Sequence, residues 1–298
     1  MGKILISGAS GLVGTALSRS LIAAGRDVRR LVRRRPVAPD AAFWDPAGGV
    51  LDAAAFDDID AVVHLAGENI AAGRWTPAFK QRILSSRVEG TRLIAVAVGR
   101  CDPPPPLIVS SAIGYYGDRG DQVVGVGSTP GEGFLAEVCQ QWEAAAEPAR
   151  QAGGRVVHLR IGMVVSRSGG ALKRMVTPFR LGLGGVVGDG RQRVSWIHLD
   201  DLVAVIEHIL GREDLAGPFD AVAPHPVTNR ELTQALGRVL GRPTVLPMPA
   251  ALVRLVFGEM GQELLLASTR VEPAGLLSSG FDFRFADLES ALRQELAP

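Results

Sequence analysis

The sequence predicts an α/β fold, built on a doubly wound parallel sheet with a smaller α+β lobe toward its C-terminal end. Short apolar runs of strand length alternate with longer segments of helical period, which is typical of strands covered by helices on both faces. The chain has 298 residues, of which 47% are hydrophobic and 21% are charged. A chain of this length can bury a stable core without disulfide bonds or a structural metal. We expect domains at residues 1–222 and 223–298, with segments near 163–196 contributing to the smaller lobe.

Strands and helices are predicted to alternate through the first half of the chain. Lys3–Ser7 is apolar and is expected to be the first strand. A helix follows a glycine-rich turn and ends at Gly25, which suits a left-handed C-terminal cap. The remaining strands are expected at Asp27–Val32, Ala61–Ala66, Leu107–Ser111 and Arg155–Arg160, and helices at residues 79–98 and 132–152.

The second half of the chain has a different pattern. Residues 169–190 are rich in glycine and weakly periodic, which indicates loops and short elements. Asp201 is expected to cap a helix, and Thr228 and Glu231 match a capping box before another. A strand is expected at Phe219–Val222 and an apolar-faced helix at residues 252–266.

Charge and cysteine content exclude several classes of protein. Lys and Arg total 32 against 31 Asp and Glu, and this net charge of +1 supplies no global field for nucleic acid or an anionic membrane. Cys101 and Cys139 are too few for a disulfide framework, and no His, Cys, Asp or Glu spacing matches a metal site. No apolar stretch approaches the ~20 residues of a membrane span. We expect a cytoplasmic protein without a bound metal.

A glycine-rich loop, residues 8–14, directly follows the first strand and opens the first helix. A dinucleotide pyrophosphate requires close approach of the backbone and free N–H groups at a helix N-terminus. Side chains at the first two glycines would block that approach, whereas the third lets helix and strand pack. Three glycines forming only a tight turn are the alternative. The predicted cofactor contacts are Gly8, Ser10, Gly11, Leu12, Val13 and Gly14.

The end of the second strand indicates which dinucleotide binds. An acidic residue there favours NAD, whereas an arginine accommodates a 2′-phosphate. Arg33 and Arg34 follow Val32, without an acid, and guanidinium groups bind phosphate bidentately. We therefore predict NADP(H), with Arg33 the principal contact and Arg34 secondary. A solvated basic edge, or a nucleic-acid patch over Arg29–Arg35, is the alternative.

Four motifs occur in order along the chain: Gly8-x-x-Gly11-x-x-Gly14, His64–Gly67, Ser110–Gly117 and Trp196–Leu202. Three C-terminal segments follow them: Gly258–Met260, Ser268–Val271 and Gly280–Phe283. The four motifs resemble those of extended short-chain dehydrogenase/reductases. The C-terminal segments are similar to the small domain of unknown function that ends an atypical subgroup of NAD(P)-dependent epimerase/dehydratase-like proteins. That subgroup is catalogued as epimerase family proteins and formerly as cell-division-inhibitor-like.

The resemblance implies a Rossmann-type sheet of about seven strands and a C-terminal substrate lobe. It also implies that Leu65, Ala66 and Gly67 pass close to the adenosine and ribose. Ser110 and Ser111 would end the strand beneath the nicotinamide.

Catalysis does not carry over from the family. Members that oxidise or epimerise sugars use a Tyr-x-x-x-Lys pair, in which lysine lowers the pKa of the tyrosine that transfers the proton. Leu135 and Cys139 stand at these positions here, and Ala112 replaces the Ser/Thr donor. Between Glu132 and Glu147 there is neither tyrosine nor lysine.

A relocated proton donor is therefore required if the chain is an enzyme. The sequence has two tyrosines, and we predict Tyr115 and Ser111 as catalytic residues, with Tyr116 packed. The leading hypothesis is an NADP(H)-dependent oxidoreductase or epimerase acting on a small carbonyl or nucleotide-sugar-like ligand. The alternative is a non-catalytic NADPH-binding regulatory or scaffold protein. The substrate stays unidentified, and a homodimer is left open.

Overall fold

The computed structural model describes residues 2–35 and 38–296, and the chain forms two compact units. Each unit is assembled from interleaved segments, and residues 163–196 lie within the second. The expected domain boundary at residue 222 stays a prediction. The first unit comprises Met1–Ser111, Val138–Leu159 and Ile206–Pro218, and the second comprises Ala112–Glu137, Arg160–Val205 and Phe219–Pro298.

A large parallel sheet organises the first unit, as the apolar runs predict. The strand order is β12-β8-β6-β5-β1-β2-β3-β4, with β4 antiparallel to β3. The predicted strands are found with ends shifted by at most two residues. No strand is predicted at β3 or β4, because these segments are short and become extended through pairing, β3 with β2 and β4 with β3. The strands are β1 Lys3–Ser7, β2 Asp27–Val32, β3 Ala41–Asp45, β4 Val50–Leu51, β5 Ile59–His64, β6 Leu107–Ala112, β8 Val156–Ile161 and β12 Gly217–Ala221.

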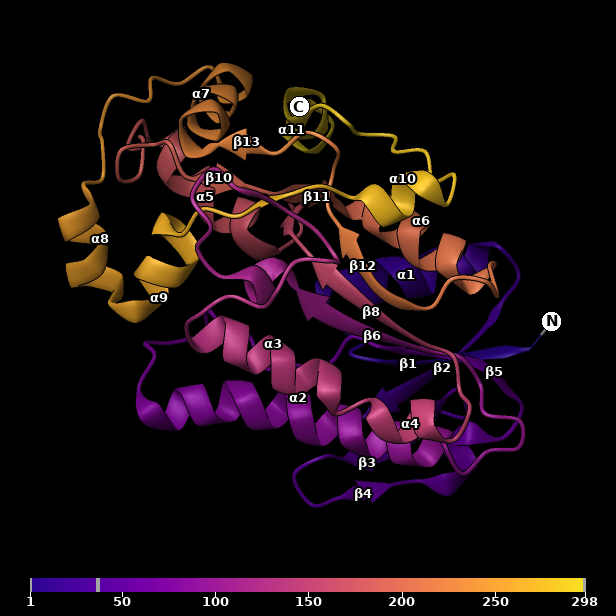
Figure 1. Cartoon of the computed structure of the whole chain (residues 1–298). Coiled ribbons are helices and arrows are strands. Elements are labelled where there is room, and N and C mark those ends of the chain that lie inside the picture. Colours follow the sequence, from indigo (N-terminus) through magenta and orange to yellow (C-terminus); the bar gives the residue numbers. More distant parts are fainter. Residues whose placement is uncertain (1, 36–37, 297–298) are drawn as a thin grey trace. The chain divides into compact units, whose positions relative to one another are not determined.

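The order of the strands reverses between β1 and β5. From β1 the chain passes through α1 (Leu12–Ala23) to β2, and from β5 it passes through α2 (Pro77–Val98) to β6 on the other side. Because parallel crossovers are right-handed, these opposite directions place α1 and α2 on opposite faces of the sheet, as Figure 1 shows. The loops that follow β1 and β5 therefore flank the crevice where such sheets bind ligands.

Local sequence explains where these two helices begin and end. The Thr76 hydroxyl accepts a hydrogen bond from the N–H of Phe79, and Pro77 occupies the first turn of α2. Helix α1 ends as predicted at Gly25, which has a φ of 74° and donates its N–H to the carbonyl of Ile22.

The helix predicted over residues 132–152 is in fact two helices, α3 (Phe134–Ala144) and α4 (Glu147–Gln151). Pro148 explains the break. Its ring would clash with the carbonyl four residues earlier, at Ala144, and it has no N–H to donate. The same proline is well suited to the first turn of α4.

A core of the first unit lies between its sheet and the helices on the face that α2 covers. Trp44 on β3 and Trp142 on α3 are its largest members. A short 3₁₀ turn, Ala53–Phe56, closes one side of this core through Ala55. The other members include Leu5, Leu31, Val62, Ile94, Val98, Leu107, Val109, Ala149 and Val156.

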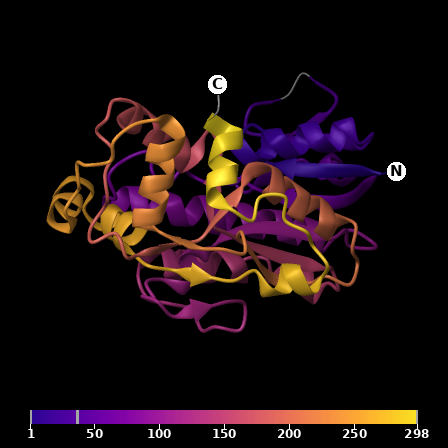
Figure 2. The same cartoon turned by 90° about the horizontal axis from the view of Figure 1, so that it is seen from above.

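Short strand pairs and helices make up the second unit. Helices α7 and α11 pack against each other (Figure 2), with Leu232, Leu236, Leu288 and Leu292 in a shared core. The paired strands are β7 Val123–Val124 with β14 Arg270–Val271, β9 Met163–Val165 with β11 Trp196–His198, and β10 Arg193–Val194 with β13 Val227–Thr228. The helices are η2 Ile113–Tyr116, α5 Gly170–Arg180, α6 Leu199–Leu210 (which continues into the first unit), α7 Asn229–Leu240, α8 Ala250–Phe257, α9 Glu259–Gly261, η3 Gln262–Leu266, α10 Ala274–Ser278 and α11 Leu288–Leu296.

Two predictions for this unit are wrong. Residues 169–190 contain a helix, α5, because Leu172, Val176 and Phe179 recur at helical spacing and are buried in the core. The helix predicted over 252–266 is broken, since Gly258 has a φ of 59° and ends α8. A single turn, α9, and a π-helical turn, η3, follow it.

The two predicted helix caps have different outcomes. The Thr228–Glu231 capping box of α7 is confirmed. Asp201 does not cap α6, which already begins at Leu199. Its buried carboxylate instead accepts hydrogen bonds from the N–H groups of Arg284 and Phe285, each 2.9 Å, and so anchors the segment before α11.

Candidate functional site

The loop after β1 is shaped by two glycines that leave no room for a side chain. Gly8 has a φ of 70°, and a Cβ on it would lie 2.8 Å from the main chain of Leu65 and Ala66. A Cβ on Gly14 would lie 2.2 Å from the carbonyl oxygen of Gly8. At Gly14 the first turn of α1 therefore packs closely against the main chain of the loop. The contacts at Gly8 bring the loop after β1 against the segment after β5.

Gly11 differs from the other two glycines because its surroundings are open. Gly11 is exposed. Among the described atoms beyond its chain neighbours, only the carbonyl oxygen of Gly8 would lie within 4 Å of a Cβ added to Gly11, at 3.2 Å. Gly11 is also the N-cap of α1, which has no side-chain cap and no acidic residue in its first turn. Main-chain N–H groups and the positive end of the helix dipole are therefore available to an anion. Ser10 is exposed beside this helix end, and Leu12 and Val13 are half-buried in its first turn.

A hydrogen-bonded cluster joins the ends of β1, β5 and β6. Nδ1 of His64 lies 2.5 Å from the hydroxyl of Ser7, which also accepts a hydrogen bond from the N–H of Leu65 at 3.2 Å. The buried Ser110 donates its hydroxyl to the carbonyl of His64 at 3.0 Å. This cluster holds the backbone at Leu65, while Ala66 stays half-buried and Gly67 is exposed. The cofactor contacts predicted for Leu65–Gly67 and Ser110 stay predictions.

His64 makes the stability of the chain dependent on pH. Burial, with a smaller contribution from Arg87, lowers the pKa of His64 from 6.5 to about 3. Between these values the unfolded chain binds one proton more than the folded chain, so stability is full above pH 6.5 and falls as pH decreases. The free energy of unfolding should drop by roughly 1.4 kcal/mol per pH unit below 6.5. Urea unfolding from pH 7.5 to 4.5 measures this slope.

Two variants separate this effect from general acid sensitivity. His64→Asn keeps a hydrogen-bonding side chain without an ionisable ring and should flatten the slope. His225→Asn removes an exposed histidine and should leave the slope unchanged. Equal slopes in the parent chain and in His64→Asn would contradict the assignment.

Arg33 and Arg34 lie at the same edge of the sheet as the glycine loop. They directly follow β2, which is parallel to β1, and both are exposed. The neighbouring arginines have other contacts: Arg29 donates to the carbonyls of residues 54, 55 and 57, Arg30 pairs with Asp40 at 2.7 Å, and Arg35 lies over Phe43. These contacts weaken the nucleic-acid interpretation, which requires one basic surface over Arg29–Arg35.

Arg87 on α2 is a residue at this site that the motifs do not identify. Its Nη1 donates to the carbonyls of Glu68 and Ile83, each at 3.1 Å, and its guanidinium lies 4.9 Å from the ring centre of Trp142. A Cβ on Gly67 would lie 3.3 Å from its Cζ. Burial lowers the pKa of Arg87, yet an arginine remains charged. A single arginine in an amphipathic helix gives no sequence signal for this placement.

The predicted catalytic region on β6 and α3 contains a serine–glutamate pair. Ser111 is 3% exposed and donates its hydroxyl to Oε1 of Glu143 at 2.8 Å. On α3, Cys139 is buried at 2% exposure. The first turn of this helix is capped by Glu263, whose carboxylate accepts hydrogen bonds from the N–H groups of Phe134 and Leu135 at 2.8 and 2.9 Å.

The two tyrosines differ in their surroundings. Tyr116 is fully buried, donates its hydroxyl to Asp220 at 2.7 Å and accepts a hydrogen bond from Arg160 at 2.9 Å. Burial and Asp220 raise its pKa well above the usual range. Because its side chain is fully buried, Tyr116 is packed, as predicted. Tyr115 is half-buried, with Cζ of Arg160 at 3.5 Å from its ring centre. Catalytic roles for Tyr115 and Ser111 stay predictions.

Two family models match the chain. Residues 4–221 match the NAD dependent epimerase/dehydratase family, and residues 248–295 match a domain of unknown function, DUF1731. The chain belongs to the NAD dependent epimerase/dehydratase family. Membership confirms the resemblance drawn from the glycine loop and the later motifs, and the Rossmann-like parallel sheet agrees with it.

Curated members of the epimerase family resemble the chain over nearly its whole length. An epimerase family protein of Mycobacterium bovis is 44% identical over 289 residues, covering 97% of this chain and 96% of its own. The human epimerase family protein SDR39U1 is 37% identical over 299 residues, covering 99% of this chain and all of its own.

Two solved structures of the family have similar folds. Human SDR39U1, crystallised with NADPH, has a TM-score of 0.90 at 36% identity and covers 99% of both chains. A nucleoside-diphosphate sugar epimerase from Corynebacterium glutamicum has a TM-score of 0.83 at 36% identity, and the match spans 99% of this chain but 58% of that longer one.

The described residues contain neither a metal-ligating cluster nor a helix that could span a membrane. No group of three or more His, Cys, Asp or Glu residues in the described part of the chain could hold a metal ion. Within residues 2–35 and 38–296, no helix combines the length and apolarity that crossing a bilayer requires.

Proposed function

We propose that the chain binds NADP(H) at the loop between β1 and α1. The observation that carries this proposal is the uncapped N-terminus of α1 behind an exposed Gly11, at the point where the strand order reverses. The N–H groups there suit a pyrophosphate, and the exposed Arg33 and Arg34 suit a 2′-phosphate. A human relative crystallised with NADPH supports the same cofactor.

The further cofactor contacts follow from the same edge of the sheet. Leu65, Ala66 and Gly67 would contact the adenosine and ribose from the end of β5. Arg87 would add a cation beside them, since Nη1 is already anchored to two carbonyls and the guanidinium lies against Gly67. The planar guanidinium of Arg87 suits bidentate hydrogen bonding to two oxygens of a ribose or a phosphate.

For the reaction, we propose an oxidoreductase or epimerase acting on a small carbonyl or a nucleotide-sugar-like ligand. The nucleoside-diphosphate sugar epimerase among the similar structures supports this class. NADPH, when bound, supplies a hydride. The chain must then supply a proton donor for the carbonyl oxygen. Tyr115 is our candidate because the hydroxyl of Tyr116 already donates its hydrogen bond to Asp220. Ser111 would orient the carbonyl.

Tyr115→Phe tests the catalytic proposal. The variant retains the ring that Arg160 contacts and removes only the hydroxyl. Turnover should fall by about 10²–10⁴-fold, the usual contribution of general acid catalysis. NADPH affinity should stay unchanged. Oxidation of NADPH by a panel of carbonyl substrates, followed by absorbance, measures turnover, and calorimetry measures affinity. Full activity in Tyr115→Phe would contradict the role of this residue.

A non-catalytic NADPH-binding protein is the second candidate, and one observation favours it. Helix α3 carries Leu135 and a buried Cys139 where the family's catalytic pair stands, and Glu263 from another segment fixes its first turn. A regulatory or scaffold protein needs the glycine loop and Arg33 but no proton donor. If no carbonyl compound changes NADPH absorbance and a partner protein binds only the cofactor-loaded chain, this candidate is favoured.

Cofactor binding itself is tested by titrating the chain with NADPH and NADH side by side in a calorimeter. We expect tight binding of NADPH and much weaker binding of NADH, because NADH has no 2′-phosphate for Arg33 to contact. Absence of binding by either nucleotide would leave the glycine turn a purely architectural feature and would overturn both candidate functions.

A further inference from the structure

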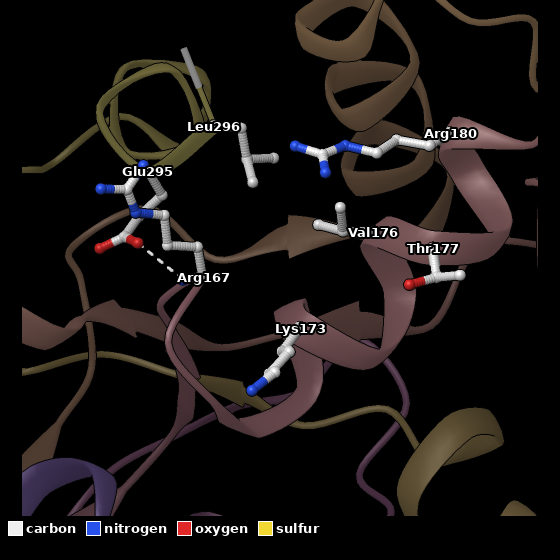
Figure 3. Close-up of a pocket in the computed structure, with 7 residues that line it drawn as sticks. All are labelled: Arg167, Lys173, Val176, Thr177, Arg180, Glu295 and Leu296. Carbon is white, nitrogen blue, oxygen red and sulfur yellow. Dashed lines mark hydrogen bonds between the residues drawn. The ribbon is translucent and has the colours of Figure 1, made fainter. Parts of the chain in front are cut away.

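A basic hollow lies in the second unit beside helices α5 and α11 (Figure 3). Its volume is about 420 Å³, within the usual range for small-molecule sites. It is separate in sequence from the glycine loop and from the tyrosines. The residues that line it are Arg167, Lys173, Val176, Thr177, Arg180, Glu295 and Leu296.

Cations dominate the lining of this hollow. Three basic side chains, Arg167, Lys173 and Arg180, face it with one carboxylate, that of Glu295. Among the residues that the structure describes, none of these three cations forms an ion pair, and all three are exposed. Like charges around a shared concave surface concentrate counter-ions from solution.

The carboxylate of Glu295 lies beside two other groups. Its Oε2 accepts a hydrogen bond from the N–H of Arg167 at 2.6 Å, and its Oε1 lies 3.1 Å from Nε2 of the buried His198. The Glu295 side chain is 12% exposed. It carries one negative charge against the three cations of the lining, so the hollow retains an excess of positive charge.

Arg180 is placed to contact a ligand directly. In Figure 3 its side chain extends over Val176 toward Leu296 on the opposite helix. A guanidinium binds carboxylate or phosphate oxygens with two parallel hydrogen bonds. Val176 and Leu296 provide apolar contact for a carbon skeleton, and Thr177 adds a hydroxyl.

From this arrangement we infer that the hollow between α5 and α11 binds a small organic molecule carrying two or more oxyanion groups, either a phosphate ester or a polycarboxylate. The cations hold the charged groups, and the apolar residues contact the carbon chain. This site does not depend on the cofactor site proposed above, so either can fail without the other.

The test uses the full chain, labelled with ¹⁵N and assigned, in amide-shift titrations with sodium citrate and with sodium pyrophosphate. Sodium chloride at equal ionic strength is the reference. Saturable shifts should appear at the amides of Val176, Thr177 and Leu296. Stronger binding of citrate assigns a polycarboxylate, and stronger binding of pyrophosphate assigns a phosphate compound.

Four variants locate the site, each checked for an unchanged melting temperature. Lys173→Gln and Arg180→Gln should each weaken binding about fivefold. Arg174→Gln removes the same charge from an exposed position on α5 outside the lining and should leave binding unchanged. Glu295→Gln should strengthen binding, because it removes the one negative charge of the lining while retaining an acceptor for Arg167. Non-saturable shifts, or equal losses in Arg174→Gln and Arg180→Gln, would overturn the inference.

Discussion

Arg33→Ala should bind NADPH about 30-fold more weakly than the parent chain, because charge-assisted hydrogen bonds to a phosphate contribute about 2 kcal/mol. Its affinity for NADH should stay unchanged, since NADH carries no 2′-phosphate. Calorimetric titration of both proteins with both nucleotides measures the two effects. Arg34→Ala should show a smaller loss, as the secondary contact.

Arg100→Ala is the matched control for Arg33→Ala. Arg100 is also an exposed arginine of the first unit, but it precedes β6 and so lies toward the amino ends of the strands, away from the glycine loop. Removing this charge should leave both affinities unchanged. An equal loss of NADPH and NADH affinity in Arg33→Ala would show that Arg33 does not read the 2′-phosphate.

Gly14→Ala should destabilise the fold by about 3 kcal/mol or more. The added Cβ would lie 2.2 Å from the carbonyl oxygen of Gly8 and 2.8 Å from Cα of Ala9, so the main chain of the loop must move. Overpacking of this kind against backbone is among the costliest single substitutions. Urea unfolding measures the loss, and NADPH binding should disappear with the displaced loop.

Gly11→Ala separates cofactor approach from folding. Its Cβ would meet the carbonyl oxygen of Gly8 at 3.2 Å and otherwise points into open space. Stability should therefore change by less than about 1 kcal/mol, whereas NADPH affinity should fall at least tenfold because the pyrophosphate loses its close approach to the main chain. A stable variant with unchanged NADPH affinity would contradict the proposed position of the pyrophosphate.

The features that the sequence predicts well are those that short-range chemistry decides. The glycine loop, the capping box at Thr228 and the left-handed cap at Gly25 each depend on the conformations available to a few adjacent residues. The predicted strands are found because apolar runs of this length suit burial on both faces of a sheet.

Two of the differences from the predicted helices occur at residues with a strong local signal. Pro148 ends α3 and begins α4, and Gly258 ends α8 at a positive φ. Both residues are visible in the sequence. The other errors, at β3, β4, α5 and Asp201, occur where pairing, burial or a hydrogen bond with other segments outweighs a weak local pattern.

The sequence by itself determined the glycine loop, the arginines after β2, the family and the absence of tyrosine and lysine from α3, because these are properties of residues adjacent along the chain. Only the tertiary structure decided which side chains meet: Ser7 with His64, Arg87 with Gly67, Tyr116 with Asp220 and Glu263 with the first turn of α3. The physical reason is that such contacts join residues far apart in sequence. These contacts form through hydrogen bonding and burial as the chain folds, and no local sequence pattern encodes them.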